Sequence, residues 1–147
     1  MKTTQKLFYI FLAGGLGGFT NSLVVWSLAK LGITPALGFT MIPGGGPEWW
    51  MRRIAASALW GIIFLIPICQ KKPVTKGAIL SVLPWLSSVL FVFPVQMKMG
   101  FFGMGFGVAT PLWTLFFAMV WGVTGTLFLA KWYPGNSNLK STPQRLI

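Results

Sequence analysis

Long stretches without a charged side chain are the feature that most constrains this chain. Four of them are candidate membrane spans, at residues 7–29, 54–70, 77–97 and 99–130. A helix needs about 20 predominantly apolar residues to cross the hydrocarbon of a bilayer. The fourth stretch is longer than one span needs, and Pro111 inside it is tolerated in the first turn of a helix. This division of the chain favours helices that cross a membrane.

We therefore expect an all-α membrane protein with a single integral membrane domain over residues 1–147. The sequence predicts four transmembrane helices and a cytoplasmic tail. The approximate ranges are 7–29, 51–69, 77–97 and 110–132, with the tail at 133–147. The composition agrees, because 54% of the residues are hydrophobic and 9% are charged, whereas soluble domains carry about a quarter of their residues as charged side chains. A soluble globular fold and a disordered chain are both excluded.

The charge balance indicates orientation. The chain has 12 basic residues and one acidic residue, with a formal net charge of +11. The basic residues stand between the apolar stretches, a layout typical of a protein in a lipid bilayer rather than of one that binds nucleic acid. Eight lie at the N-terminus, in the 71–76 loop and near the C-terminus, and four lie on the opposite side. Since cytoplasmic loops carry the excess of Lys and Arg, we expect an inner-membrane protein with both termini in the cytoplasm and an uncleaved first helix.

The inventory of reactive side chains excludes most catalytic chemistry. The chain has no histidine, one cysteine (Cys69) and one acidic residue (Glu48). It therefore lacks the ligands of a zinc or haem site, a carboxylate pair, and an imidazole to activate a nucleophile. We expect no enzyme activity, no metal and no cofactor.

Small residues recur at every fourth position within three of the predicted helices. Such faces let helix backbones approach closely in lipid. The residues are Gly14, Gly18 and Ser22 in the first helix, Ser57 and Gly61 in the second, and Ala118, Gly122 and Thr126 in the fourth. The pattern leaves open whether the partner helix belongs to the same chain or to another. Because four short helices bury little surface, we expect a homo-oligomer or a larger membrane complex.

The loops that follow the first and third predicted spans look alike. Residues 31–47 and 99–108 are both rich in glycine, and the helices that follow carry Trp60-Gly61 and Trp121-Gly122. A duplication would give two helical hairpins of the same orientation. The loops are too apolar for ordinary aqueous loops, so they are either re-entrant elements or segments lying flat in the headgroup region.

Asn21, beside Thr20, is the only amide deep within a predicted span. Its side chain either bonds a permeating solute or holds helices together. With Gly38 and Gly105 of the two loops, these residues form the candidate pathway. Glu48 and Arg52 have the i,i+4 spacing of an ion pair at a helix start.

The run from Ala13 to Trp26, the stretch from Leu31 to Phe39 and the pair Trp60-Gly61 resemble small four-span bacterial membrane proteins with no assigned activity. The resemblance implies four helices and no particular function. The chain is also similar to the small dimeric fluoride channels in its length, its four spans and the Gly-Gly-x-x-Gly start of its first helix. Those channels continue with an arginine where this chain has Phe19-Thr20-Asn21, and their later motifs have no match, so neither their ion nor their site residues apply.

Two functions follow from the sequence. The first is an oligomeric small pore or permease for a small anionic or neutral solute, since a cationic rim favours such solutes. The second is a non-transporting accessory or scaffolding subunit that docks its small-residue faces onto a larger membrane complex.

Overall fold

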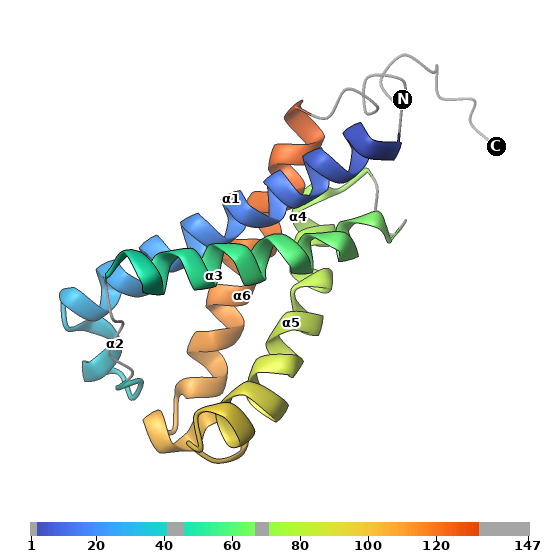
Figure 1. Ribbon diagram of the computed structural model, residues 1–147. Coiled ribbons are helices and arrows are strands. Elements are labelled where there is room, and N and C mark those ends of the chain that lie inside the picture. The colour runs from blue at the N-terminus through green and yellow to red at the C-terminus, as the bar shows by residue number, and fades with distance from the viewer. Residues whose placement is uncertain (1–2, 41–45, 67–70, 133–147) are drawn as a thin grey trace.

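The computed structural model describes residues 3–40, 46–66 and 71–132, and every regular element within them is helical (Figure 1). In chain order the elements are α1 (Thr3–Lys30), α2 (Ile33–Ala36), α3 (Pro47–Trp60), η1 (Gly61–Leu65), α4 (Pro73–Leu80), α5 (Val82–Ser87), η2 (Ser88–Gln96), η3 (Phe101–Phe106) and α6 (Thr110–Trp132). In this part of the chain, three helical segments are long and apolar enough to cross a membrane: α1, the run from Pro73 to Gln96, and α6. The all-helical fold and these three segments indicate a membrane protein.

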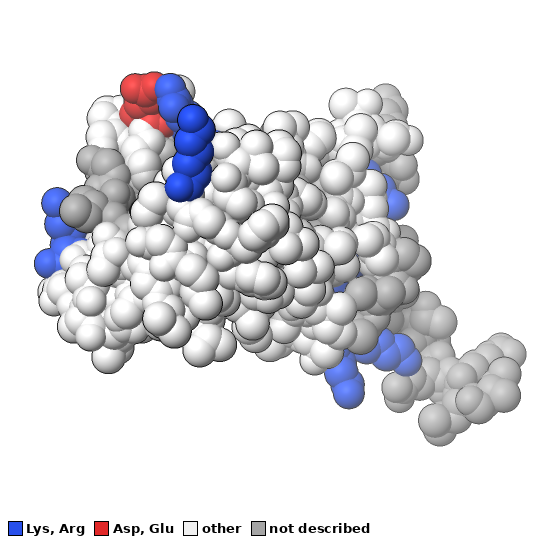
Figure 2. All heavy atoms as spheres, turned by 90° about the horizontal axis from the view of Figure 1, so that it is seen from below, with Lys and Arg blue, Asp and Glu red and all other residues white. Residues whose placement is uncertain are grey.

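The helices form two antiparallel hairpins, α1 with α3 and the α4–α5–η2 run with α6 (Figure 1). Both hairpins begin at the same end of the molecule, where α6 also finishes. Charged side chains gather toward two sides of the surface seen in Figure 2, with a broad uncharged region between them. This distribution fits helices whose ends, and not their middles, meet water.

The two hairpins join where α1 crosses α6. A Cβ on Gly17 would lie 2.5 Å from the carbonyl oxygen of Trp121, so the two backbones are in contact there. The Trp121 indole Nε1 donates to the carbonyl oxygen of Gly14 over 3.1 Å. The Trp121 ring also stacks on Phe64, with 5.0 Å between the centroids. Together with Ala13 and Leu80, these aromatic side chains form a buried cluster at the end nearer the termini.

The helix boundaries differ from the expected ranges in three places. The first helix begins at Thr3 rather than at residue 7. The second begins at Pro47, because a proline suits the first helical turn, and it tightens to a 3₁₀ turn at Gly61. The second helix ends at Leu65, before the expected end near residue 69, because the backbone of Ile66 is extended. The tail at 133–147 lies outside the described residues. The fourth helix has the expected range, Thr110–Trp132.

The third predicted helix, expected over 77–97, is a helical run from Pro73 to Gln96. The segment begins at Pro73 and is divided into α4, α5 and the π-helix η2. Pro84 lacks an N–H, and its ring crowds the carbonyl of Leu80 four residues earlier, which is where α4 ends. Pro94 lies inside η2, and the wider π-helical turn accommodates a proline that an α-helix would resist.

The small-residue faces pack inside the chain. A Cβ on Gly14 would lie 2.6 Å from the carbonyl oxygen of Ser57, and Gly18 also faces Ser57. Gly61 faces α1, and Gly122 faces Gly77 of α4. The Thr126 hydroxyl donates to the carbonyl oxygen of Pro73 over 2.7 Å. The partner helices of these faces, left open by the sequence, are helices of the same chain.

The two glycine-rich loops meet each other at the end remote from the termini. The backbone N–H and the hydroxyl of Thr40 both donate to the carbonyl oxygen of Phe106, each over 2.7 Å. The rings of Phe39 and Phe106 meet edge to face at 6.1 Å. Each loop satisfies part of its backbone on the other, which irregular backbone in an apolar setting requires.

Candidate functional site

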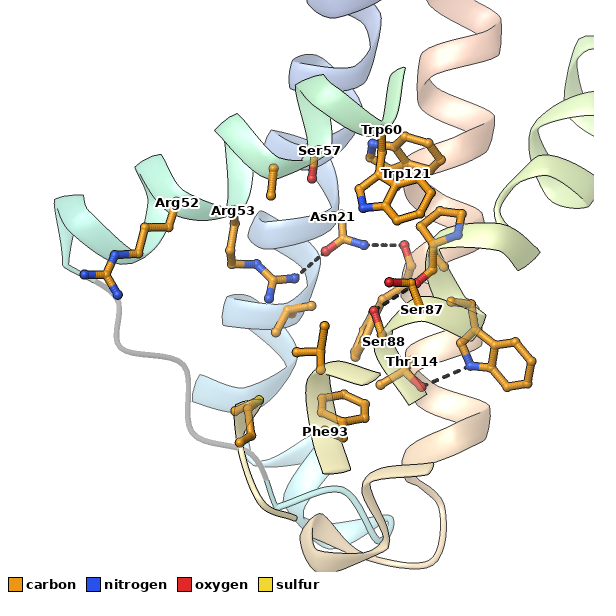
Figure 3. A pocket seen from close by; sticks show the side chains of 18 of the residues that line it. Asn21, Arg52, Arg53, Ser57, Trp60, Ser87, Ser88, Phe93, Thr114 and Trp121 are labelled. Atoms are coloured by element: carbon orange, nitrogen blue, oxygen red, sulfur yellow. Dashed lines mark hydrogen bonds between the residues drawn. The ribbon is translucent and has the colours of Figure 1, made fainter. Parts of the chain in front are cut away.

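A cavity of about 520 Å³ lies between the two hairpins (Figure 3). Side chains of α1 and α3 line one side, and side chains of α5, η2 and α6 line the other. The lining is largely aromatic and aliphatic, with a small polar group set among it. The polar members are Asn21, Arg53, Ser57, Ser87, Ser88 and Thr114, with Arg52 and Gln96 at exposed positions.

Arg53 is the central polar residue of this cavity. Its side chain reaches from α3 to α1, where Nε donates to the Ser22 hydroxyl over 2.9 Å. Nη2 donates to Asn21 Oδ1 over 2.7 Å (Figure 3). The guanidinium also lies over the Trp49 ring, 4.9 Å from its centroid, where a cation and an aromatic face attract each other. A guanidinium has five N–H donors, so three remain after these two hydrogen bonds within the described chain.

The charge of Arg53 has no carboxylate to balance it. Glu48 is the only acidic side chain in the sequence, and it forms an ion pair with Arg52 on the exposed side of α3. The structure thus has the Glu48–Arg52 pair at its expected i,i+4 spacing, and the pair leaves Arg53 with neutral partners. An uncompensated cation at the wall of an apolar cavity favours an anionic ligand beside it.

Neutral polar groups hold the remaining walls in place. The Asn21 amide donates to the carbonyl oxygen of Phe117 in α6, so Asn21 links α1 to α6 while its oxygen accepts from Arg53. The Trp85 indole donates to the Thr114 hydroxyl over 3.2 Å (Figure 3). The Ser88 hydroxyl donates to the carbonyl oxygen of Pro84 over 3.0 Å. These contacts fix the side chains that face the cavity from both hairpins.

Aromatic side chains make up much of the cavity surface. They are Phe39, Trp49, Trp60, Trp85, Phe93, Phe117 and Trp121. Toward the termini the cavity ends at Trp121, which stacks on Phe64 in the buried cluster. The cavity is therefore closed at the end nearer the termini, and its exposed lining residues lie toward the other.

The structure brings one member of the expected pathway to the cavity and leaves three outside it. Asn21 lines the cavity, where its amide both links helices and faces the ligand space. Thr20 is not in the lining, and its hydroxyl bonds the carbonyl oxygen of Leu16 in its own helix. Gly38 and Gly105 lie in the loops, Gly38 against Ala109 and Gly105 against Met99.

Sequence reasoning missed Arg53, which lies near the start of the predicted second helix at 51–69. A signal was present in the spacing. Trp49, Arg53, Ser57 and Gly61 follow each other at intervals of four residues, so they share one face of α3. Since Ser57 and Gly61 already marked the packed face, Arg53 had to lie on it as well.

In the described chain no cluster of three metal-binding side chains occurs, and the cationic cavity does not suit a metal ion. Comparisons with known proteins add no assignment, because no family model, curated protein or solved structure matches this chain.

Proposed function

We propose that this chain is a four-span inner-membrane protein that acts as a small permease for an anionic or neutral solute, with the cavity around Arg53 as its solute site. The observation that carries the proposal is the charged guanidinium of Arg53 in the wall of the cavity. A charged side chain within a membrane segment is expensive, and such residues mark substrate or ion pathways. Arg53 has neutral hydrogen-bond partners and no carboxylate, so its charge is available to an anion.

The fourth crossing in this proposal is α3 together with η1. Fourteen residues at about 1.5 Å and five at about 2.0 Å give a length of about 31 Å. That length matches the hydrocarbon thickness of a bilayer, about 30 Å. α1 ends and α4 begins at opposite ends of the molecule (Figure 1). The chain between them, which contains α3 and η1, therefore has to run back from one end of the molecule to the other.

In the proposed mechanism Arg53 attracts the anion and offers it the donors that Ser22 and Asn21 do not use. Asn21 holds the guanidinium in place through its oxygen and holds α6 through its nitrogen. Passage toward the termini then requires the Phe64–Trp121 stack to separate, because this stack closes the cavity there. We place the termini on the cytoplasmic side.

An accessory subunit is the weaker candidate, since the small-residue faces that would dock a partner are occupied by helices of the same chain. A homo-oligomer stays part of the proposal. Because the cavity lies within one chain, an oligomer would repeat the site rather than create it.

Flux through proteoliposomes tests the permease. Purified protein is reconstituted, and efflux of chloride and acetate as anions, glycerol as a neutral solute and potassium as a cation is followed. We expect anion efflux above that of empty liposomes and a loss of at least about tenfold with Arg53→Gln, the effect of about 1.4 kcal/mol. Lys30→Gln removes an equal charge from an exposed position outside the cavity and serves as the control. Efflux no faster than from empty liposomes for all four probes would overturn the proposal.

A further inference from the structure

The cavity has three walls and an open side. α1 and α6 pack on each other at its back, α3 packs along α1, and α5 packs along α6. Within the described residues α3 has no comparable packing against α5 or η2, and Figure 1 shows α3 and α5 diverging. Exposed residues from both edges line the cavity: Ala56 from α3, Gln96 from η2, and Met97 directly after η2. The cavity therefore reaches the surface sideways, between α3 and η2.

This side opening extends from the apolar surface to the end of η2, where Gln96 and Met97 come directly before Lys98. Leu59 of α3 and Phe91 and Val95 of η2 are exposed beside it. Asn21, which marks the level of the Arg53 head, lies nine residues before the end of α1 at Lys30, or about 13 Å along the helix axis. A molecule entering between α3 and η2 would come from the bilayer, at or below the level of the lipid headgroups.

The lining near the opening changes from polar to apolar. The guanidinium of Arg53 offers three unused donors, while Val92, Phe93 and Met97 give the wall at η2 an apolar surface, with Ser88 and Gln96 as its polar members. A ligand that satisfies both parts carries an anionic group at one end and hydrocarbon at the other. Guanidinium donors suit a phosphate, which can accept two parallel hydrogen bonds from one arginine.

We infer that the substrate is an anionic phospholipid of the surrounding bilayer, bound with its phosphate at Arg53 and its acyl chains leaving between α3 and η2. The inference rests on the proposed function, since it names the substrate class of the same site. A cavity of about 520 Å³ lies within the range of ligand pockets, about 300–1,000 Å³, and it accommodates a headgroup while the chains remain in the side opening. Transport would then be movement of a lipid headgroup past Arg53.

Charge argues against a second copy of this chain as the occupant of the opening. Each copy carries 12 basic residues against one acidic residue, and that residue, Glu48, is paired with Arg52. A second copy therefore has no unpaired acidic side chain to offer Arg53. An anionic lipid headgroup, by contrast, carries a phosphate that can pair with the guanidinium.

Lipid retention measured by native mass spectrometry tests the inference. The protein is exchanged into detergent containing equal amounts of dioleoyl phosphatidylglycerol and dioleoyl phosphatidylcholine, which share their acyl chains. We expect the wild type to retain phosphatidylglycerol at least about tenfold over phosphatidylcholine. Arg53→Gln should bring the ratio close to one, and Lys30→Gln should leave it within about twofold of the wild type. A wild type that retains both lipids equally, or an Arg53→Gln protein with unchanged preference, overturns the inference.

A second variant and a competition experiment complete the test. If Arg53→Gln does not fold, Ala56→Phe fills the opening from an exposed position and should lower retention of phosphatidylglycerol at least about fivefold; unchanged retention contradicts the site. Glycerol 3-phosphate supplies the headgroup phosphate without the chains. If it displaces the lipid as well as soluble short-chain phosphatidylglycerol does at equal concentration, the apolar part contributes nothing and the inference fails, while the small-anion permease stands. If the protein retains phosphatidylglycerol but releases none of the four efflux probes, the lipid site stands and the small-anion permease fails.

Discussion

Two neighbouring glycines of α1 differ in how closely they are packed, so a substitution at each tests the contact between α1 and α3. A Cβ on Gly14 would lie 2.6 Å from the carbonyl oxygen of Ser57 and 2.9 Å from the Cα of Gly61, and backbone atoms cannot move aside. A Cβ on Gly15 would lie 3.8 Å from its nearest neighbours. We predict that Gly14→Ala destabilises the protein by about 1–3 kcal/mol through overpacking, whereas Gly15→Ala is neutral or stabilises it by up to about 1 kcal/mol. Thermal unfolding in detergent, followed by circular dichroism, measures both; equal midpoints would contradict the close approach of α1 and α3.

Asn21 and Thr20 are adjacent polar residues with different expected effects on transport. The Asn21 side chain holds Arg53 and α6, while the Thr20 hydroxyl bonds its own helix. We predict that Asn21→Leu lowers anion efflux at least about tenfold because the guanidinium loses its support. Thr20→Val should stay within about twofold of the wild type. Efflux from proteoliposomes at matched protein content gives the comparison, and normal efflux from Asn21→Leu would remove this residue from the mechanism.

The sequence could predict Asn21, because an amide within an apolar run has to find a partner in the protein. It could not predict which partner. Arg53, 32 positions away in the chain, becomes a neighbour of Asn21 only when α3 packs along α1. Glu48 and Arg52 were predictable as a pair, since helix geometry alone brings residues four apart together.

At the scale of helices and loops, some features also follow from the local sequence, while others depend on tertiary contacts. The division of the third span follows from local sequence, because Pro84 and Pro94 each remove a backbone N–H from the helix. The loops show the opposite case. Their glycines mark irregular backbone in the sequence, and Gly38 and Gly107 do have positive φ. Their pairing through Thr40 and Phe106 depends on tertiary contact.

The junction of the two loops can be tested with a matched pair of glycines. Gly107 has φ +133, and a Cβ there would collide with the carbonyl oxygen of Gly38. Gly32 also has a positive φ, +75, with no atom within 4 Å of its Cβ position. We predict that Gly32→Ala costs about 1 kcal/mol of backbone strain and that Gly107→Ala costs more, because it also separates the hairpins. Limited proteolysis and thermal unfolding report the difference; equal effects would show that the loops do not touch.

For the molecule as a whole, the apolar runs were enough to predict helices in a membrane, whereas the repeat of Trp-Gly left a duplication open. Gly61 packs on α1 and Gly122 on α4, and Trp60 and Trp121 both line the cavity. The matching positions thus have matching neighbours in the two hairpins. The cavity between the hairpins was not predictable, because its walls come from segments that lie far apart in the sequence.

The number of crossings decides how this molecule sits in the bilayer, and two positions are enough to test it. If α3 and η1 cross, residues 30 and 72 lie on opposite sides; if they do not, both lie on the same side. We predict that Lys30→Cys, in a Cys69→Ser background, reacts with an impermeant maleimide added to intact cells, and that Lys72→Cys reacts only after permeabilisation. Lys98→Cys should behave as Lys30→Cys, and Thr4→Cys as Lys72→Cys. Labelling of Lys30→Cys and Lys72→Cys from one side would reduce the crossings to three and place Arg53 outside the hydrocarbon, where its charge would no longer need an anion.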